Sequence, residues 1–228
     1  MNNSNSLEQN KIDHLASMAK GALGACPIIG SLLSEAIGYL LPNQRFDRAV
    51  EFIRAIEIVV TEDRERLNKL EDNLKTPEGL DIFEEGLLQT VRSVSSERKE
   101  RLARLVGKSL TTEELKYAES KKILNLYREL TDPEIIWLLF YASRPSLNSG
   151  RHPLMEKHPE ILYPASRALN VEQKEIDRAA LQDSYKNTLL RLGLIQEQNR
   201  SYTLTTLGRL LIRYITDGEY EEDSWVSG

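Results

Sequence analysis

The chain has 228 residues and a net charge of −5, with 40% hydrophobic and 29% charged residues. These values are ordinary for a globular protein, so they exclude a wholly disordered chain and one held to nucleic acid by bulk charge. The single cysteine, Cys26, excludes a disulfide framework within the chain and suits a reducing compartment. Because no basic stretch leads directly into an apolar core at the N-terminus, we expect no secretory signal and a cytoplasmic protein.

Two helices are predicted before residue 45. The first opens with a capping box, in which Gln9 follows Ser6 by three residues. The second has Pro27 in its first turn and ends near Leu41, where Pro42 follows.

The second of these helices belongs to an unusual span, Gly21–Leu41, whose only charged residue is Glu35. Gly30, Ser34 and Gly38 are spaced four apart, so they form one face of small residues, which allows close helix packing in a bundle or a membrane. We expect a buried bundle helix, because the acid argues against permanent insertion. Conditional release onto the inner membrane, as a peripheral contact, stays open.

The middle of the chain predicts helices throughout. One long helix is expected from Phe46 to about Leu74, because apolar residues recur at three- and four-residue steps. Its charged far end is expected to project into solvent. Further helices are predicted after four capping positions: Thr76, Ser95 or Ser96, Thr111 with Glu114, and Thr131 with Glu134. No strand is expected before Ala142.

Turn-forming residues cluster between 144 and 158, which predicts a linker. The linker would separate a helical bundle, 1–143, from a C-terminal module, 159–216. The remaining residues, 217–228, form a tail whose first part carries five acids and no base. A tail of this kind is typical of a solvated chain end.

The C-terminal module has the pattern of a winged helix. A helix from about Ile176 to Leu192 ends at Gly193, and two short extended pieces follow around the turn 197–200. Thr205 then caps a last helix, in which Gly208 allows close packing. The expected core consists of Leu192, Leu194, Ile195, Leu204, Leu207 and Leu211. The predicted fold is therefore mainly α, a multi-helix bundle followed by a winged-helix module with a short β-hairpin.

No constellation in the sequence indicates catalysis. The histidines, His14, His152 and His158, lack cysteine or helix-face partners at metal-binding spacing. Glycines 21 and 24 have neither the lysine of a phosphate-binding loop nor a preceding strand. We therefore expect a protein that is not an enzyme, with no catalytic residue, metal or cofactor.

Nucleic acid is the usual ligand of a winged helix, and four residues are candidate contacts for DNA or for a partner protein: Arg178, Gln182, Lys186 and Arg200. Against DNA stand Asp177 and Asp183 on the same helix. Basic residues also outnumber acidic ones by only three between 151 and 216. A typical DNA-recognition unit is more basic, so the sequence favours a protein partner over nucleic acid.

Three motifs together resemble a known group. They are Pro-Ile-Ile-Gly at 27–30, Leu-Thr-Asp-Pro-Glu at 130–134, and Leu-Arg-Leu-Gly-Leu-Ile at 190–195 with Tyr-Thr-Leu-Thr-x-x-Gly at 202–208. Their order is similar to that of the bacterial abortive infection alpha proteins and spans most of the chain. The resemblance implies a small helical protein linked to phage defence, with no catalytic residues to carry over.

Two functions therefore compete. The first is a non-enzymatic interaction or effector protein of the abortive-infection type, whose helical region acts on a partner or membrane while the winged helix senses or packs. The second is a winged-helix DNA-binding transcriptional regulator. The sequence identifies neither the partner nor the oligomeric state.

Overall fold

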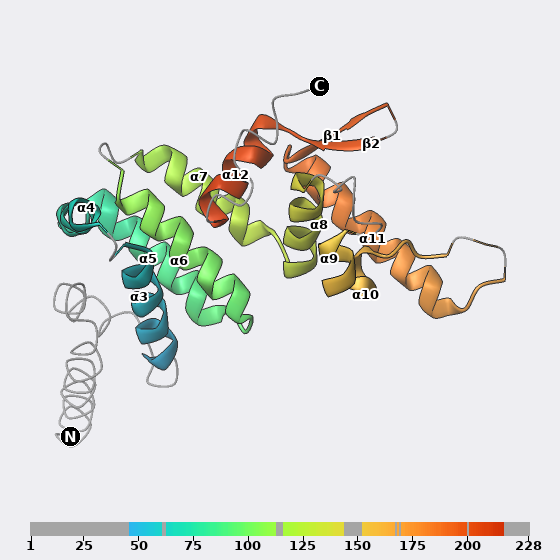
Figure 1. The fold of residues 1–228 in the computed structure, drawn as a ribbon, viewed down its shortest axis with the longest axis horizontal. Coiled ribbons are helices and arrows are strands. Elements are labelled where there is room, and N and C mark those ends of the chain that lie inside the picture. Colours follow the sequence, from blue (N-terminus) through green and yellow to red (C-terminus); the bar gives the residue numbers. More distant parts are fainter. Residues whose placement is uncertain are drawn as a thin grey trace, which may run out of the picture. The chain divides into compact units, whose positions relative to one another are not determined.

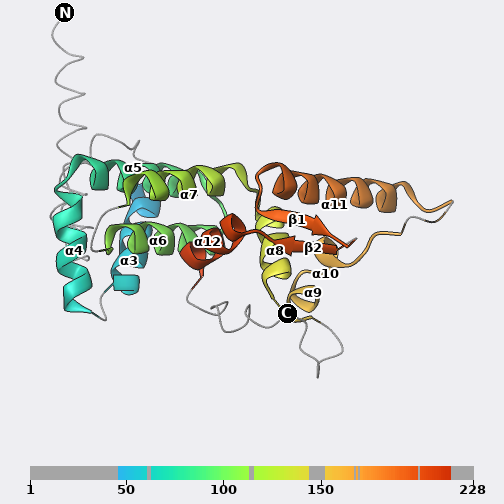
Figure 2. The ribbon, with the colours of Figure 1, turned by 90° about the horizontal axis from the view of Figure 1, so that it is seen from above.

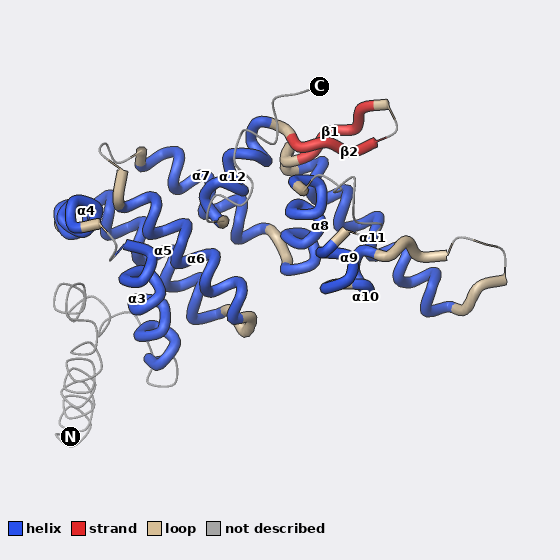
Figure 3. Tube along the Cα trace, viewed as in Figure 1, coloured by secondary structure: helices blue, strands red, loops and turns tan. Residues whose placement is uncertain are grey.

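A computed structural model describes residues 46–60, 63–112, 116–143, 152–166, 168, 170–199 and 201–216 (Figure 1). Within these residues the chain is mainly helical, and its strands form one two-stranded antiparallel sheet (Figure 3). Contacts divide the chain into two compact units, Met1–Leu124 and Asn125–Gly228, called unit 1 and unit 2 below. The mainly helical fold with a short hairpin is the coarse architecture that the sequence predicts.

The described helices of unit 1 are α3 (Phe46–Val60), α4 (Arg64–Leu74), α5 (Pro77–Arg92), α6 (Ser96–Leu110) and the first part of α7 (Tyr117–Glu129). Of these helices, α4, α5 and α6 each have an N-cap side chain that accepts a backbone N–H. The Thr76 hydroxyl accepts the Gly79 N–H at 3.1 Å, and Ser95 accepts the Arg98 N–H at 3.2 Å. The predicted starts of α5 and α6 are therefore confirmed.

The single long helix expected from Phe46 to Leu74 is wrong. The helix α3 ends at Val60, and α4 begins at Arg64 with Asp63 as its N-cap. Asp63 is extended, and its carboxylate accepts the Glu65 N–H at 2.8 Å. A local cap inside the charged run thus starts a new helix although the apolar spacing continues.

The helix start expected at Thr111 is also wrong. Thr111 is the C-cap of α6, where its N–H donates to the Lys108 carbonyl, and α7 begins only at Tyr117. Glu114 lies outside the described residues. The same threonine can end one helix or begin the next, because its side chain competes for backbone groups in both positions.

The core of unit 1 lies where α5 packs on both α3 and α6 (Figure 1). The rings of Phe52 and Phe83 meet at 5.8 Å between centroids. Arg48 donates to the Val91 carbonyl at 2.8 Å, which ties the start of α3 to the end of α5. The helices α3 and α6 run in the same direction, because contacts join their first halves through an ion pair and their last turns through Gly107.

Unit 2 is arranged around α8 (Asp132–Ala142), which has several main packing partners. They are α10 (Pro159–Leu162), α11 (Gln173–Arg191), β2 (Ser201–Leu204) and α12 (Thr206–Ile215). The Glu134 carboxylate accepts both the Thr131 N–H at 2.6 Å and the Thr131 hydroxyl at 2.8 Å. The capping box predicted at this position is confirmed.

The hairpin of unit 2 follows α11 directly (Figure 2). Its strands, β1 (Ile195–Gln198) and β2, pair with Ile195 opposite Leu204. Gly193, at φ 68°, ends α11, in a backbone conformation that glycine adopts without steric cost. The Thr205 hydroxyl donates to the Gly193 carbonyl at 2.6 Å and accepts the Gly208 N–H at 3.0 Å, so Thr205 joins the hairpin to α12.

Most of the core predicted for this module is buried. Leu194, Ile195, Leu204 and Leu211 are buried, and Leu192 and Leu207 are half-buried. A Cβ at position 208 would collide with the Leu194 carbonyl. Glycine at this position therefore allows α12 to approach the start of the hairpin closely.

The structural division of the chain differs from the boundary drawn at 144. The helix α8 packs with α11, β2 and α12, so it belongs to unit 2 and not to the bundle that precedes it. A short helix, α9 (Pro153–Lys157), lies within the predicted linker and packs on α10. Among the described helices, none has the length and apolar character needed to cross a membrane.

Candidate functional site

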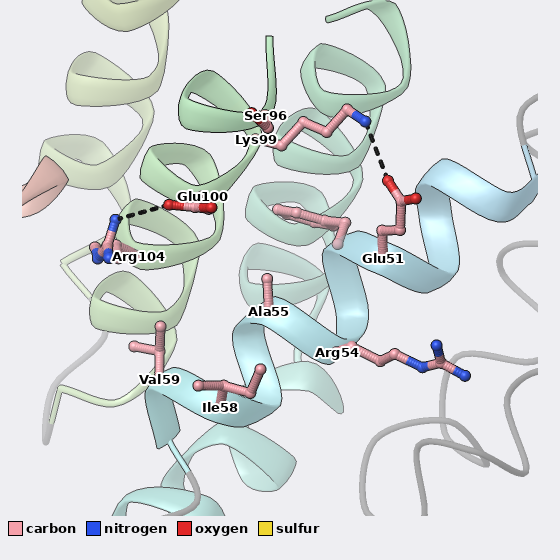
Figure 4. A pocket seen from close by; sticks show the side chains of 10 residues that line it. Glu51, Arg54, Ala55, Ile58, Val59, Ser96, Lys99, Glu100 and Arg104 are labelled. Atoms are coloured by element: carbon pink, nitrogen blue, oxygen red, sulfur yellow. Dashed lines mark hydrogen bonds and ion pairs between the residues drawn. The ribbon is translucent and has the colours of Figure 1, made fainter. Parts of the chain in front are cut away.

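An apolar groove runs between α3 and α6 on the surface of unit 1 (Figure 4). Its volume is about 450 Å³. The lining residues from α3 are Glu51, Phe52, Arg54, Ala55, Ile58 and Val59, and those from α6 are Ser96, Lys99, Glu100 and Arg104. The floor is formed by the apolar residues of α3, and the charged side chains stand at the rim.

The floor of the groove is apolar because α3 has apolar side chains outside the face that packs in the core of unit 1. One side of α3 is buried in the unit, and its members are Ala49, Val50, Phe52, Ile53, Ile56 and Val60. Ala55, Ile58 and Val59 extend the apolar surface around the helix beyond that side. The side chain of Ile58 is 75% exposed, although isoleucine is among the residue types most often buried.

The end of the groove near Val59 is shaped by a close helix approach. A Cβ at Gly107 would lie 3.2 Å from the Val59 side chain, so glycine brings α6 near α3 at this end. At the other end the Lys99 ammonium pairs with Glu51 at 3.0 Å, as the dashed line in Figure 4 marks. Contacts between α3 and α6 are therefore present at both ends of the groove.

The rim of the groove carries a small positive excess. Glu51 pairs with Lys99, and Glu100 lies 4.0 Å from Arg104. Arg54 has no ion pair among the described residues, and its guanidinium extends away from the other labelled side chains in Figure 4. Three cations therefore face two acids around an apolar floor.

The groove contains no pair of side chains suited to nucleophilic or acid–base chemistry. Its only hydroxyl, Ser96, has no histidine beside it among the lining residues. A volume in this range suits a bulky apolar group. A furrow between two packed helices also fits the ridge of a third helix. The groove can therefore bind an apolar helical segment on its floor, and its rim can contact charged groups of that segment.

The candidate contact residues on α11 are engaged within unit 2. Arg178, Gln182 and Lys186 are four apart, so they share one face of α11. The Arg178 guanidinium donates to the Pro164 carbonyl at 3.1 Å and lies 3.2 Å from the Glu175 carboxylate. The Lys186 ammonium stands 4.7 Å from the centre of the Trp137 ring. This face is turned towards the rest of the unit.

Gln182 is buried at the centre of that face. Its amide donates to the carbonyls of Ile161 and Tyr163, at 2.9 and 2.7 Å, and its oxygen accepts the Ala165 N–H at 3.2 Å. Gln182 thus ties α11 to the last turn of α10 and to the segment that follows it. The fourth candidate, Arg200, lies outside the described residues, as do Gly30, Ser34 and Gly38.

The exposed side of α11 carries apolar residues that the sequence pattern did not single out. Ile176 is 50% exposed and Leu181 is 53% exposed. Asp177 is exposed between them. Their apolar character was visible in the sequence, but their exposure depends on which face of α11 meets α8.

An aromatic cluster surrounds His152 in unit 2. The imidazole packs edge-on against Phe140 at 4.9 Å, and its Nδ1 accepts the Leu154 N–H at 3.1 Å as the N-cap of α9. Burial lowers the pKa of His152, and burial raises the pKa of Tyr141 in the same cluster. Within the described residues, no three histidine, cysteine or acidic side chains gather as a metal site would require.

Within the part of the chain that the structure describes, the groove in unit 1 and the exposed side of α11 are thus two surfaces with exposed apolar side chains that a partner could contact. Comparison of the chain with family models, with curated proteins and with solved structures finds no match.

Proposed function

We propose that the protein is a non-enzymatic interaction or effector protein of the phage-defence type, which binds an apolar helical segment in the groove between α3 and α6. The observation that carries the proposal is the apolar floor of the groove, where Ile58 is 75% exposed. Exposed apolar surface of this kind, rimmed by charge, is typical of interaction sites. The phage-defence setting is supported by the motif order that resembles the abortive infection alpha proteins.

The module around α11 would serve this protein as a winged helix that contacts protein. Support comes from the order of its elements, in which α8, α10 and α11 precede the hairpin and α12 follows it. The exposed side of α11 carries Ile176 and Leu181 with an acid between them. Such a surface suits a partner protein better than a phosphate backbone, which attracts cations.

A plating experiment with two matched substitutions tests the proposal. Ile58→Glu places a charge on the floor of the groove, and Val94→Glu places the same charge at an 88% exposed position outside its lining. We expect cells that express the wild type to reduce plaque formation by a sensitive phage. The Ile58→Glu protein should lose about tenfold or more of that protection, because it loses an apolar anchor. The Val94→Glu protein should retain it.

Both variants are checked for an unchanged thermal transition, since substitutions at exposed positions rarely unfold a protein. Equal protection by Ile58→Glu and the wild type would remove the groove from the proposed function. A wild-type protein that protects against no member of a broad phage panel would remove the defence setting.

The alternative is a winged-helix DNA-binding transcriptional regulator. It is favoured by the same element order, with α11 directly before the hairpin. A DNA-binding α11 would need cations on its exposed side. The exposed basic residues of α11 are Lys174 and Arg191, and the exposed acid Asp177 would repel the phosphate backbone. A duplex-binding assay at varied salt separates the two functions.

A further inference from the structure

We infer that the groove in unit 1 is the interface of a symmetric dimer, in which α3 of a second copy of this chain lies antiparallel in the groove between α3 and α6. The inference rests on the proposed function, which assigns an apolar helical segment to the groove, and it names α3 of the second copy as that segment. In a dimer with two-fold symmetry each copy inserts its own α3 and receives the α3 of the other.

The surface of the groove combines a projecting side chain with a hollow. Ile58 is 75% exposed, so it projects from α3, and the hollow beside it lies over Phe52, Ala55 and Val59 (Figure 4). A two-fold axis through this surface places each Ile58 in the hollow of the other copy, because one patch provides both the projection and the hollow. A self-complementary patch of this kind favours a second copy as the occupant.

The exposed stripe of α3 has opposite charges in its two halves. Its members are Asp47, Glu51, Arg54 and Ile58, which are all exposed and are spaced by four, three and four residues, so they lie on one side of the helix. The acids come first in this stripe, and the base follows them. When two copies of α3 lie antiparallel, the acidic half of each stripe therefore meets Arg54 of the other copy. Such complementary charge fixes the orientation of the two helices.

The helix α6 becomes more basic in the same direction. Up to Glu100 two acids balance two bases, and beyond Glu100 the helix carries bases but no acid: Arg101, Arg104 and Lys108. Since α3 and α6 run parallel, the basic part of α6 lies beside the second half of α3. An antiparallel helix with acids in its first half matches this distribution, and α3 is such a helix. Antiparallel packing also places the helix dipoles in the favourable sense.

The register of the two helices follows from the position of the hollow. An axis near Ala55 places Ile58 of each copy level with Phe52 of the other, over the floor of the groove. Since a helix rises by about 1.5 Å per residue, each Ile58 is then about one turn from the axis. The two isoleucines would be buried on either side of the axis.

The same register gives Arg54 an ionic partner. Lys99 pairs with Glu51, so Glu100 is level with Phe52. Arg54 of one copy is then about one turn along the axis from Glu100 of the other, which an arginine side chain can span. Arg54 has no ion pair among the described residues, and the side chain of Glu100 is 61% exposed. The two-fold axis forms this pair twice.

Sedimentation velocity and light scattering of the full chain test the inference. We expect the wild type to have the mass of two chains and to dissociate on dilution, with a dissociation constant in the micromolar range that is common for small interfaces. Ile58→Glu should weaken the dimer by about tenfold or more, because it removes the apolar anchor. The control Val94→Glu changes an 88% exposed residue that is level with the start of α3, beyond the end of the second copy's α3, and it should leave the mass unchanged.

A mixing experiment separates lost association from misfolding. Arg54→Glu and Glu100→Arg should each weaken the dimer by about tenfold, because each variant brings like charges together across the axis. An equal mixture of the two variants should associate as tightly as the wild type, since both cross-axis pairs are then formed between opposite charges. Far-ultraviolet circular dichroism checks that each variant keeps its helices.

Three outcomes would overturn the inference. They are a wild type that has the mass of one chain at every concentration, a dimer that Ile58→Glu does not weaken, and a mixture of the two charge variants that associates no better than either alone. If the wild type stays monomeric while Ile58→Glu abolishes phage protection, the groove function stands with another protein as its ligand. If Ile58→Glu dissociates the dimer and protection is unchanged, the dimer stands and the proposed function is removed.

Discussion

The amide side chain of Gln182 connects two parts of unit 2, α11 and the segment around α10, that no backbone hydrogen bonds of a helix or sheet join. Gln182 is 4% exposed and bonds three backbone groups of the segment between Ile161 and Ala165. Its sequence context, a polar helix with scattered charge, favours an exposed contact residue. The spacing of four shared with Arg178 and Lys186 correctly places all three on one face, but only the packing of α11 on α8 decides that this face is the inner one.

Replacing this amide should therefore destabilise unit 2. We expect Gln182→Leu to lower the free energy of unfolding by about 2–3 kcal/mol, because it leaves two carbonyls and one N–H without their partner. Chemical unfolding followed by Trp137 fluorescence measures the loss, in a Trp225→Phe background that removes the second tryptophan. Ser184→Ala, at an exposed position of the same helix, is the control and should change the stability by less than about 0.5 kcal/mol.

His152 gives unit 2 a predictable response to acid. Burial lowers its pKa below the ordinary value of 6.5, so the unfolded chain takes up a proton more readily than the folded one. Its contribution to stability is fully present above that ordinary value and is lost as the pH falls below it. Protonation also removes the Nδ1 lone pair that accepts the Leu154 N–H.

A substitution at the same position isolates this effect. We expect unfolding curves between about pH 5 and 7.5 to show a steeper loss of stability on acidification for the wild type than for His152→Asn, which keeps an N-cap acceptor but does not titrate. Parallel curves for the two proteins would show that His152 does not gain its proton preferentially on unfolding.

At the scale of elements, helix starts follow from local chemistry and helix partners do not. Thr76, Ser95, Thr131 and Thr205 are N-caps in the structure, as their sequence contexts predict, because a cap needs only backbone groups within three residues. The apolar spacing does not predict the break between α3 and α4, because this spacing continues from one helix into the next. The groove could not be predicted, since it depends on contacts between residues as far apart as Glu51 and Lys99.

The hairpin joins α11 to α12 through Leu194, which is fully buried. Leu194→Asp should unfold unit 2, because an unpaired carboxylate in this core costs several kcal/mol, about 3 or more. Near-ultraviolet circular dichroism and a thermal scan report the loss. The matched control is Gln196→Asp, two residues along at an exposed position of β1. An unaltered thermal transition in Leu194→Asp would show that this core is misassigned.

For the whole molecule, the charge distribution argues against tight DNA binding. The chain has a net charge of −5, and two of the candidate cations, Arg178 and Lys186, are engaged with groups of unit 2. We expect no specific duplex binding by the full-length protein at physiological salt. Fluorescence anisotropy with a pool of random duplexes measures it, and a nanomolar, salt-sensitive, sequence-selective complex would reverse the ranking of the two functions.

The parallel pairing of α3 with α6 also affects how the chain emerges from the ribosome. Lys99 is made 48 residues after Glu51, its partner across the groove. At about 5–20 residues per second, translation leaves α3 without that partner for several seconds. Its apolar floor, including Ile58, is exposed to chaperones during this interval.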